Sequence, residues 1–90
     1  MVNIYMLRCP ITGAVKYVGK TKMTLKQRLA GHGVVSSNKK NRAWHIKLKK
    51  KKLRPIIELL CVSQNRDGDA MEFFWILYFR ECRFQLSNIR

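Results

Sequence analysis

The chain has 90 residues, of which 47% are hydrophobic, a composition that suits one compact domain with a single core and excludes a disordered chain. Nineteen lysines and arginines against five aspartates and glutamates give a formal net charge of +14, so a polyanion is the expected partner, with nucleic acid favoured over an anionic membrane surface. No apolar run reaches the roughly 18 residues of a membrane span and no charged leader precedes a hydrophobic stretch, so we expect neither a transmembrane segment nor a signal peptide.

Three cysteines occur, Cys9, Cys61 and Cys82, and no two of them form a CxxC pair. Their odd number argues against a disulfide framework, and a structural zinc site would need a distant histidine. We therefore expect buried thiols and a reducing, intracellular location in the cytoplasm or nucleoid.

The start of the chain has the pattern of a β-hairpin. Residues 2–8 and 15–19 are rich in β-forming side chains, and the segment between them contains proline and glycine. A turn centred on Ile11 would place Tyr5 opposite Tyr17, so that both rings share one face of the sheet.

A helix should follow the hairpin. Thr24 and Gln27 have the spacing of a capping box, and leucines four residues apart mark a buried stripe. Arg28 and His32 are also four residues apart, on a different and polar face of this helix. Glycines at positions 31 and 33 can end it.

A second helix, with Asn41 as its cap, should turn Trp44 and Leu48 toward the core and run out through a lysine tract. No acidic residue interrupts the basic region around this helix. A solvated face is the usual explanation of a charge run, but a region of one sign only favours a track for the phosphate backbone of DNA. The predicted DNA-binding residues are Lys39, Lys40, Arg42, Lys47, Lys49, Lys50, Lys51, Lys52 and Arg54.

Beyond a proline, residues 56–62 have strong β character and predict a third strand. Asp69 should then cap a long third helix over residues 70–82. The middle of this helix, residues 73–79, is apolar on nearly all sides, which predicts a central buried helix with Trp75 in the core.

The predicted order of elements is β-β-α-α-β-α. It indicates one α+β domain spanning residues 1–90, with a small three-stranded antiparallel sheet flanked by helices.

Several short motifs occur in one order along this chain. Asn3-Ile4-Tyr5 and Tyr17-Val18-Gly19 resemble the two tripeptides that name the GIY-YIG nuclease family, except that asparagine replaces the first glycine. Because that position begins a strand, we expect the replacement to leave the chemistry unchanged.

The rest of the chain extends this resemblance. Arg28 followed one turn later by His32 is similar to the family's next signature. Glu72 matches the family's metal-binding glutamate, and Asn88 matches an asparagine near the end of the family's domain. The resemblance covers the whole chain and implies a divalent-metal-dependent endonuclease that hydrolyses phosphodiester bonds in DNA.

The resemblance also implies roles for individual residues. Glu72 would hold one Mg²⁺ or Mn²⁺ ion, which prefers oxygen ligands, and Arg28 would bind phosphate oxygens. Tyr5 would act as general base or orient the attacking water, with its pKa lowered by the metal ion, Arg28 and Lys20. Tyr17 and His32 would position the substrate or carry protons.

Asn88 would orient a neighbouring side chain. The chain shows no recognisable sequence-reading motif, so its intrinsic sequence specificity should be low, or be supplied by a second copy of the chain or by a partner protein.

Each match also has an ordinary structural explanation. Tyr5 and Tyr17 could be packed strand aromatics, and Arg28 a solvated helix residue. His32 could interact with the helix dipole, and Glu72 could belong to a capping pattern that begins at Asp69. If all of these held together, the chain would be a non-catalytic nucleic-acid-binding module that retains the nuclease fold.

Overall fold

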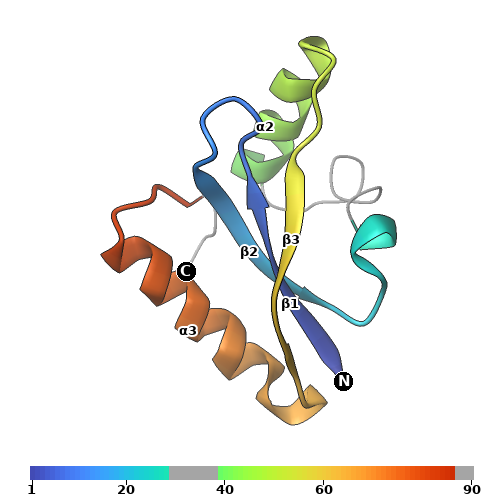
Figure 1. Ribbon diagram of the computed structural model, residues 1–90, viewed down its shortest axis with the longest axis vertical. Helices are drawn as coiled ribbons and strands as arrows, with labels where there is room; N and C mark the ends of the chain where they lie inside the picture. Colours follow the sequence, from blue (N-terminus) through green and yellow to red (C-terminus); the bar gives the residue numbers. More distant parts are fainter. Residues whose placement is uncertain (29–38, 87–90) are drawn as a thin grey trace.

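The computed structural model describes residues 1–28 and 39–86, with the backbone alone at residues 39–41. It is the expected α+β domain, built on a three-stranded antiparallel sheet in the order β2-β1-β3 (Figure 1). The elements are β1 (Val2–Arg8), β2 (Val15–Thr21), a helical turn at residues 25–28, α2 (Lys39–Lys50), β3 (Ile56–Ser63), a 3-10 turn η1 (Asn65–Asp67) and α3 (Gly68–Glu81).

The hairpin between β1 and β2 forms as predicted, but with a different register. Tyr5 pairs with Gly19, and Tyr17 pairs with Leu7. The predicted pairing of Tyr5 with Tyr17 is wrong because the turn is centred beyond Ile11, with the amide of residue 9 donating to the carbonyl of Ala14, and because the register shifts between Leu7 and Arg8. The two tyrosines still share one face, since side chains two residues apart along a strand point to the same side.

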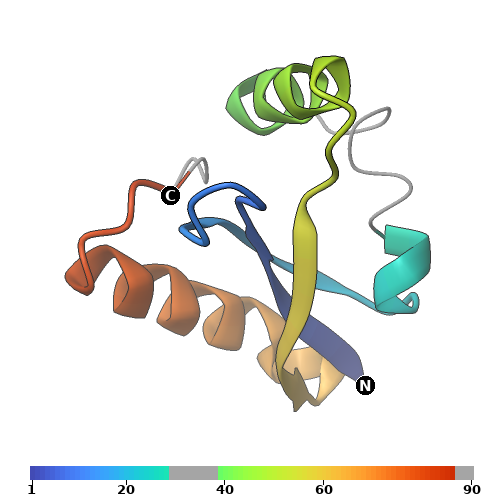
Figure 2. The ribbon, with the colours of Figure 1, turned by 45° about the horizontal axis from the view of Figure 1, so that its top comes forward.

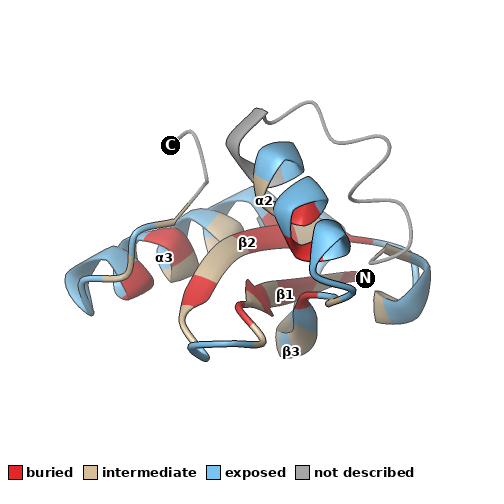
Figure 3. Ribbon diagram, turned by 90° about the horizontal axis from the view of Figure 1, so that it is seen from above, coloured by how far each residue is buried: buried red, intermediate tan, exposed pale blue. Residues whose placement is uncertain are grey.

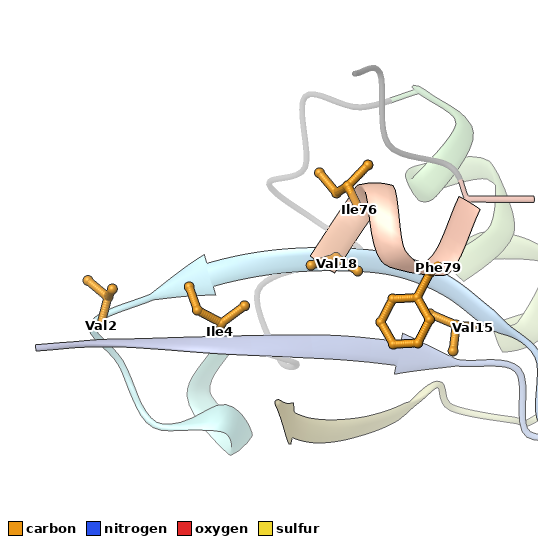
Figure 4. Packing of buried hydrophobic residues seen from close by; sticks show 6 residues of the cluster. All are labelled: Val2, Ile4, Val15, Val18, Ile76 and Phe79. Carbon is orange, nitrogen blue, oxygen red and sulfur yellow. The ribbon is translucent and has the colours of Figure 1, made fainter. Parts of the chain in front are cut away.

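The opposite face of the sheet carries the core. Val2 and Ile4 of β1 and Val18 of β2 lie against Ile76 and Phe79 of α3, and Val15 completes the cluster (Figure 4). Trp75 packs beside this cluster and donates from its indole nitrogen to the sulfur of Cys61 at 3.4 Å. Packing of one face of α3 onto the even-numbered positions of β1 therefore holds the helix to the sheet.

The expectation that α3 is buried on all sides is wrong. The side that packs on the sheet is buried, but Phe74 is 53% exposed and Leu77 is 45% exposed. Figure 3 shows this alternation of buried and exposed residues along the helix. A sheet of three strands covers only one side of a helix, and in the described part of the chain the other side of α3 faces outward.

Two predicted helix caps are also wrong. α2 begins at Lys39, so Asn41 lies inside the helix. α3 begins at Gly68 directly after η1, which places Asp69 in its first turn and Asp67 at the N-cap position. The 3-10 turn already winds the backbone in the helical sense, so the chain enters α3 without a side-chain cap.

α2 lies near the end of the sheet where β1 ends and β3 begins, away from α3 (Figures 1 and 2). Leu48 is buried as expected, Trp44 is partly buried, and His45 is buried as well. Burial lowers the pKa of His45, so this imidazole stays neutral at neutral pH. In the described ranges, neither α2 nor α3 nor any shorter helix combines the length and apolar character of a membrane span.

α2 ends in a Schellman motif that the sequence pattern did not reveal. The amide of Leu53 donates to the carbonyl of Leu48 at 2.9 Å, and the amide of Lys52 donates to the carbonyl of Lys49 at 2.9 Å. Lys52 thereby occupies the left-handed position after the helix, with φ +60°, where glycine is usual.

α3 ends in the same way. The amide of Phe84 donates to the carbonyl of Phe79. Arg83, the residue before Phe84, adopts φ +67°. The rings of Phe79 and Phe84 meet edge to face with centroids 6.0 Å apart, which supplies the apolar contact typical of this motif. Basic residues thus hold both left-handed positions, at a conformational cost of roughly 1 kcal/mol each.

This geometry predicts that Lys52→Gly stabilises the protein. Removing the side chain at φ +60° should raise the free energy of unfolding by about 1 kcal/mol. Lys51→Gly is the control, because its φ is not positive, and there the added chain entropy should cost about 0.5–1 kcal/mol. Urea denaturation of the three proteins measures both changes, and equal destabilisation by the two glycines would contradict the strain at Lys52.

Candidate active site

The Tyr5 ring packs over the backbone of Gly19 on the neighbouring strand. Tyr5 has no solvent exposure, although its hydroxyl is polar. A Cβ atom at Gly19 would lie 2.6 Å from Cζ of Tyr5 and 2.9 Å from Cε2 of Tyr17. Gly19 therefore provides the space in which the two rings lie, a role that a glycine inside a strand can signal.

Tyr5 and Tyr17 form a diagonal pair across β1 and β2. Their ring centroids are 6.4 Å apart and the ring planes are inclined by 40°. Both hydroxyl groups belong to the face of the sheet opposite the hydrophobic core, since their strand positions alternate with those of Ile4 and Val18.

Arg28 reaches this face from the helical turn that follows β2. The predicted capping box is present: the amide of Thr24 donates to Oε1 of Gln27 and the amide of Gln27 donates to Oγ1 of Thr24, each at 3.2 Å. The amide of Arg28 then donates to the Thr24 carbonyl at 3.0 Å. From this turn, Nε of Arg28 donates to the Tyr5 hydroxyl at 3.1 Å.

Two side chains of the sheet fasten the segment that carries Arg28. The amide nitrogen Nδ2 of Asn3 donates to the carbonyl of Met23 at 3.2 Å, and Oγ1 of Thr21 accepts from the amide of Met23 at 3.0 Å. Asn3 is the residue that replaces the family's first glycine, so the replacement adds a tether between β1 and the turn. The contact of Asn3 had no signal in the sequence because it links positions 20 residues apart, whereas the contact of Thr21 is a local turn between residues two apart.

Burial controls the protonation of both phenols. Loss of solvent raises the pKa of Tyr5 to about 12, against the opposing effect of the hydrogen bond from Arg28. The pKa of Tyr17 is also raised, mainly by burial. Arg28 lowers the pKa of Tyr5 as expected, but burial outweighs it, so Tyr5 keeps its proton at neutral pH in the protein alone.

Glu72 of α3 lies close enough to act electrostatically on both phenols. Its negative charge raises the pKa of Tyr5 and of Tyr17. The capping interpretation of Glu72 required Asp69 to begin the helix, whereas Asp69 lies inside α3. The carboxylate of Asp69 instead pairs with the ammonium of Lys20.

Lys20 does not join the tyrosines. It alternates with Gly19 along β2, so it lies on the face of the sheet that α3 covers. His32 and Asn88 fall outside the described residues. Tyr5, Tyr17, Arg28 and Glu72 are therefore the predicted site residues that the structure brings together, while Gly19, Asn3 and Thr21 support them and were missed.

The predicted basic region is exposed wherever its side chains are described. Lys39 and Lys40 lie in the part of α2 that is described by its backbone alone. The exposed residues are Arg42, Lys47, Lys49, Lys50, Lys51, Lys52 and Arg54.

The donor atoms near the phenols suit a hard cation held by few protein ligands. Residues 1–28 and 39–86 contain no cluster of three histidine, cysteine or acidic side chains that could enclose a metal ion. A single carboxylate, as at Glu72, fits Mg²⁺, which usually keeps several waters and takes one or two carboxylates together with substrate phosphates. The same donors do not fit a structural zinc ion, which takes four protein ligands.

The contact between Gly19 and Tyr5 predicts the effect of Gly19→Ala. The added methyl group must displace the Tyr5 ring, which should cost about 1–3 kcal/mol of stability as overpacking does. It should also lower the nuclease activity that the resemblance implies by on the order of 10²-fold, since small displacements of a positioning group have effects of that size. Val18→Ala is the control: it weakens the core on the other face of the sheet, and its hydrolysis, measured at a temperature where both variants are folded, should stay near the wild-type rate.

Comparison with known proteins agrees with this arrangement. The model of the GIY-YIG catalytic domain matches residues 1–85 of the chain. Searches of curated proteins and of solved structures found no match. The family model covers almost the whole length, including the strands with both tyrosines, the turn with Arg28 and the helix with Glu72. The chain therefore belongs to the GIY-YIG family of endonucleases.

Proposed function

We propose that this chain is a divalent-metal-dependent endonuclease that hydrolyses phosphodiester bonds in DNA with low intrinsic sequence specificity. Three observations support the proposal: Arg28 donates a hydrogen bond to Tyr5, the rings of Tyr5 and Tyr17 pair, and the charge of Glu72 acts on both phenols. Ordinary structural roles for these residues would not require them to meet.

Hydrolysis of a phosphodiester needs a positioned water, stabilisation of the charge that develops on the phosphoryl oxygens, and help for the leaving oxygen. Glu72 is the residue that would hold Mg²⁺ or Mn²⁺, and such an ion supplies Lewis-acid stabilisation of that charge when bound. Arg28 binds Tyr5 through Nε, and its terminal nitrogens are the donors suited to phosphate oxygens.

The protonated Tyr5 phenol supports a positioning role in the protein alone. Its oxygen accepts the hydrogen bond from Arg28, so the phenol would hold the guanidinium in position. Tyr17 lies beside it as a second phenol. A role as general base requires that substrate and metal binding lower the pKa of Tyr5.

The exposed basic residues of α2 and the turn after it support non-specific binding to DNA. Lysines and arginines on one element favour contacts with phosphates, which carry no sequence information. His32 and Asn88 remain proposed members of the site, as substrate-positioning or proton-carrying and orienting residues respectively.

The proposal predicts that Glu72→Gln abolishes most cleavage and leaves DNA binding intact. The substitution keeps the size of the side chain and removes the charge that a divalent cation needs. Plasmid cleavage with Mg²⁺ or Mn²⁺ should fall by at least roughly 10²-fold, and chelator should reduce wild-type cleavage to the same background. Glu81→Gln, on the last turn of the same helix, is the matched control and should cut at the wild-type rate. Cleavage by Glu72→Gln at the wild-type rate would remove the metal role.

The basic region predicts a steep dependence of DNA binding on salt. Replacing Lys50 and Lys51 together by glutamine should reduce the log–log salt slope by about 0.9 for each phosphate that the variant no longer neutralises. The control is the double variant in which glutamine replaces Arg66 and Arg80. It removes the same amount of charge from the α3 side of the protein and should leave the salt slope nearly unchanged. Binding is measured in chelator by fluorescence anisotropy, so the result does not depend on cleavage, and equal slopes for both double variants would show that the lysines are only solvated.

A further inference from the structure

Strand β3 carries two half-exposed apolar residues on the face of the sheet that holds Tyr5, which we call the tyrosine face. Leu59 pairs with Tyr5 of β1, and Val62 pairs with Asn3. Residues directly opposite each other on neighbouring antiparallel strands point to the same side of the sheet, so both belong to the tyrosine face. Leu59 is 49% exposed and Val62 is 48% exposed, and we refer to these two residues as the apolar pair.

An additional residue in β3 brings the apolar pair to one face. Neighbouring residues of β1 pair with Cys61 and with Leu59, so Leu60 between them has no partner position on β1. This is the pattern of a β-bulge, and Leu60 and Cys61 both pack toward the hydrophobic core. Strict alternation would put residues three apart on opposite faces, and Val62 would then point toward α3. Bulges beside active sites re-aim side chains in this way.

Both members of the apolar pair adjoin residues that hold Arg28. Tyr5, opposite Leu59, accepts the hydrogen bond from Nε of Arg28. Asn3, opposite Val62, tethers the backbone of the segment that leads to Arg28. The Tyr5 ring leans over β2, which lies on the other side of β1 from β3, so it does not extend over Leu59. The apolar pair therefore borders the place where the guanidinium is held.

A DNA strand presents apolar surface beside each of its phosphates. The deoxyribose and the base edge flank the phosphodiester, and side chains such as leucine contact them in the minor groove or insert between base steps. Neighbouring strands of a sheet are about 4.8 Å apart, and successive phosphates of one DNA strand are about 3.4 Å apart along the helix axis. The apolar pair thus falls within about three nucleotides of a phosphate bound by Arg28.

We propose that Leu59 and Val62 contact the deoxyribose and base edges of the DNA strand whose phosphate Arg28 binds. The inference rests on the proposed function, because it takes DNA as the substrate. The continuity of the apolar pair with the residues that hold Arg28 identifies this occupant. Such a contact adds affinity without releasing counterions, unlike the phosphate contacts proposed for the basic residues of α2.

DNA binding measured by fluorescence anisotropy in chelator, over a range of salt concentrations, tests the proposal. Leu59→Thr and Val62→Thr together should lower the association constant by about tenfold at every salt concentration, with an unchanged log–log slope. Threonine keeps the β propensity of the strand, and thermal melts check that the variant is folded. Ile56→Thr is the control, because Ile56 is 39% exposed on the same strand but pairs with Arg8 on the face toward α3. Its association constant should stay within about twofold of the wild-type value.

Each outcome separates the apolar contact from the proposed function. A parallel displacement of the salt dependence in the double variant alone supports the contact. Equal association constants for the wild type and the double variant, or a changed slope, overturn the contact and leave the proposed function standing. A wild type that does not bind DNA overturns both. Cleavage is measured separately in Mg²⁺, so binding without cleavage contradicts the nuclease activity and still decides the apolar contact.

Discussion

The packing of the Tyr5 ring on the bare backbone of Gly19 positions the rest of the site. With no side chain at Gly19, the ring can lie across the neighbouring strand and be buried there. Its hydroxyl is then held within 3.1 Å of Nε of Arg28 and within the electrostatic range of Glu72. The same burial keeps the phenol protonated, so one steric feature of a strand sets both the geometry and the charge of the site.

Arg28 depends on this contact and on a series of local hydrogen bonds. Asn3 and Thr21 hold the backbone at Met23, and the capping box of Thr24 and Gln27 then starts the turn that carries the guanidinium. Because β1 contributes both Asn3 and Tyr5, a single strand fixes the turn and its hydrogen-bond acceptor. The replacement of the family's glycine by Asn3 is thus part of how this chain aligns Arg28.

The two sides of α3 have different environments. The side toward the sheet contributes Ile76 and Phe79 to the core and carries Glu72 at its N-terminal half. The outward side carries exposed apolar residues, among them Phe74 and Leu77. One helix thereby stabilises the fold and carries the carboxylate that acts on the phenols, while the basic residues of α2 remain exposed.

Periodicity and short motifs, which act within a few residues, were enough to predict the order of elements, the hairpin and the capping box at Thr24. The same motifs are the basis for proposing Tyr5, Tyr17, Arg28 and Glu72 as site residues. Which groups share an environment depended instead on contacts between distant parts of the chain. The position of the turn and the register shift between Leu7 and Arg8 together place Tyr5 opposite Gly19. Burial raises the pKa of Tyr5 by more than the neighbouring Arg28 lowers it. Lys20 lies on the opposite face of the sheet, where it pairs with Asp69. The apolar middle of α3 has the pattern of a buried helix, yet a three-stranded sheet covers one side of it, since exposure depends on what surrounds a helix and not on its own residues.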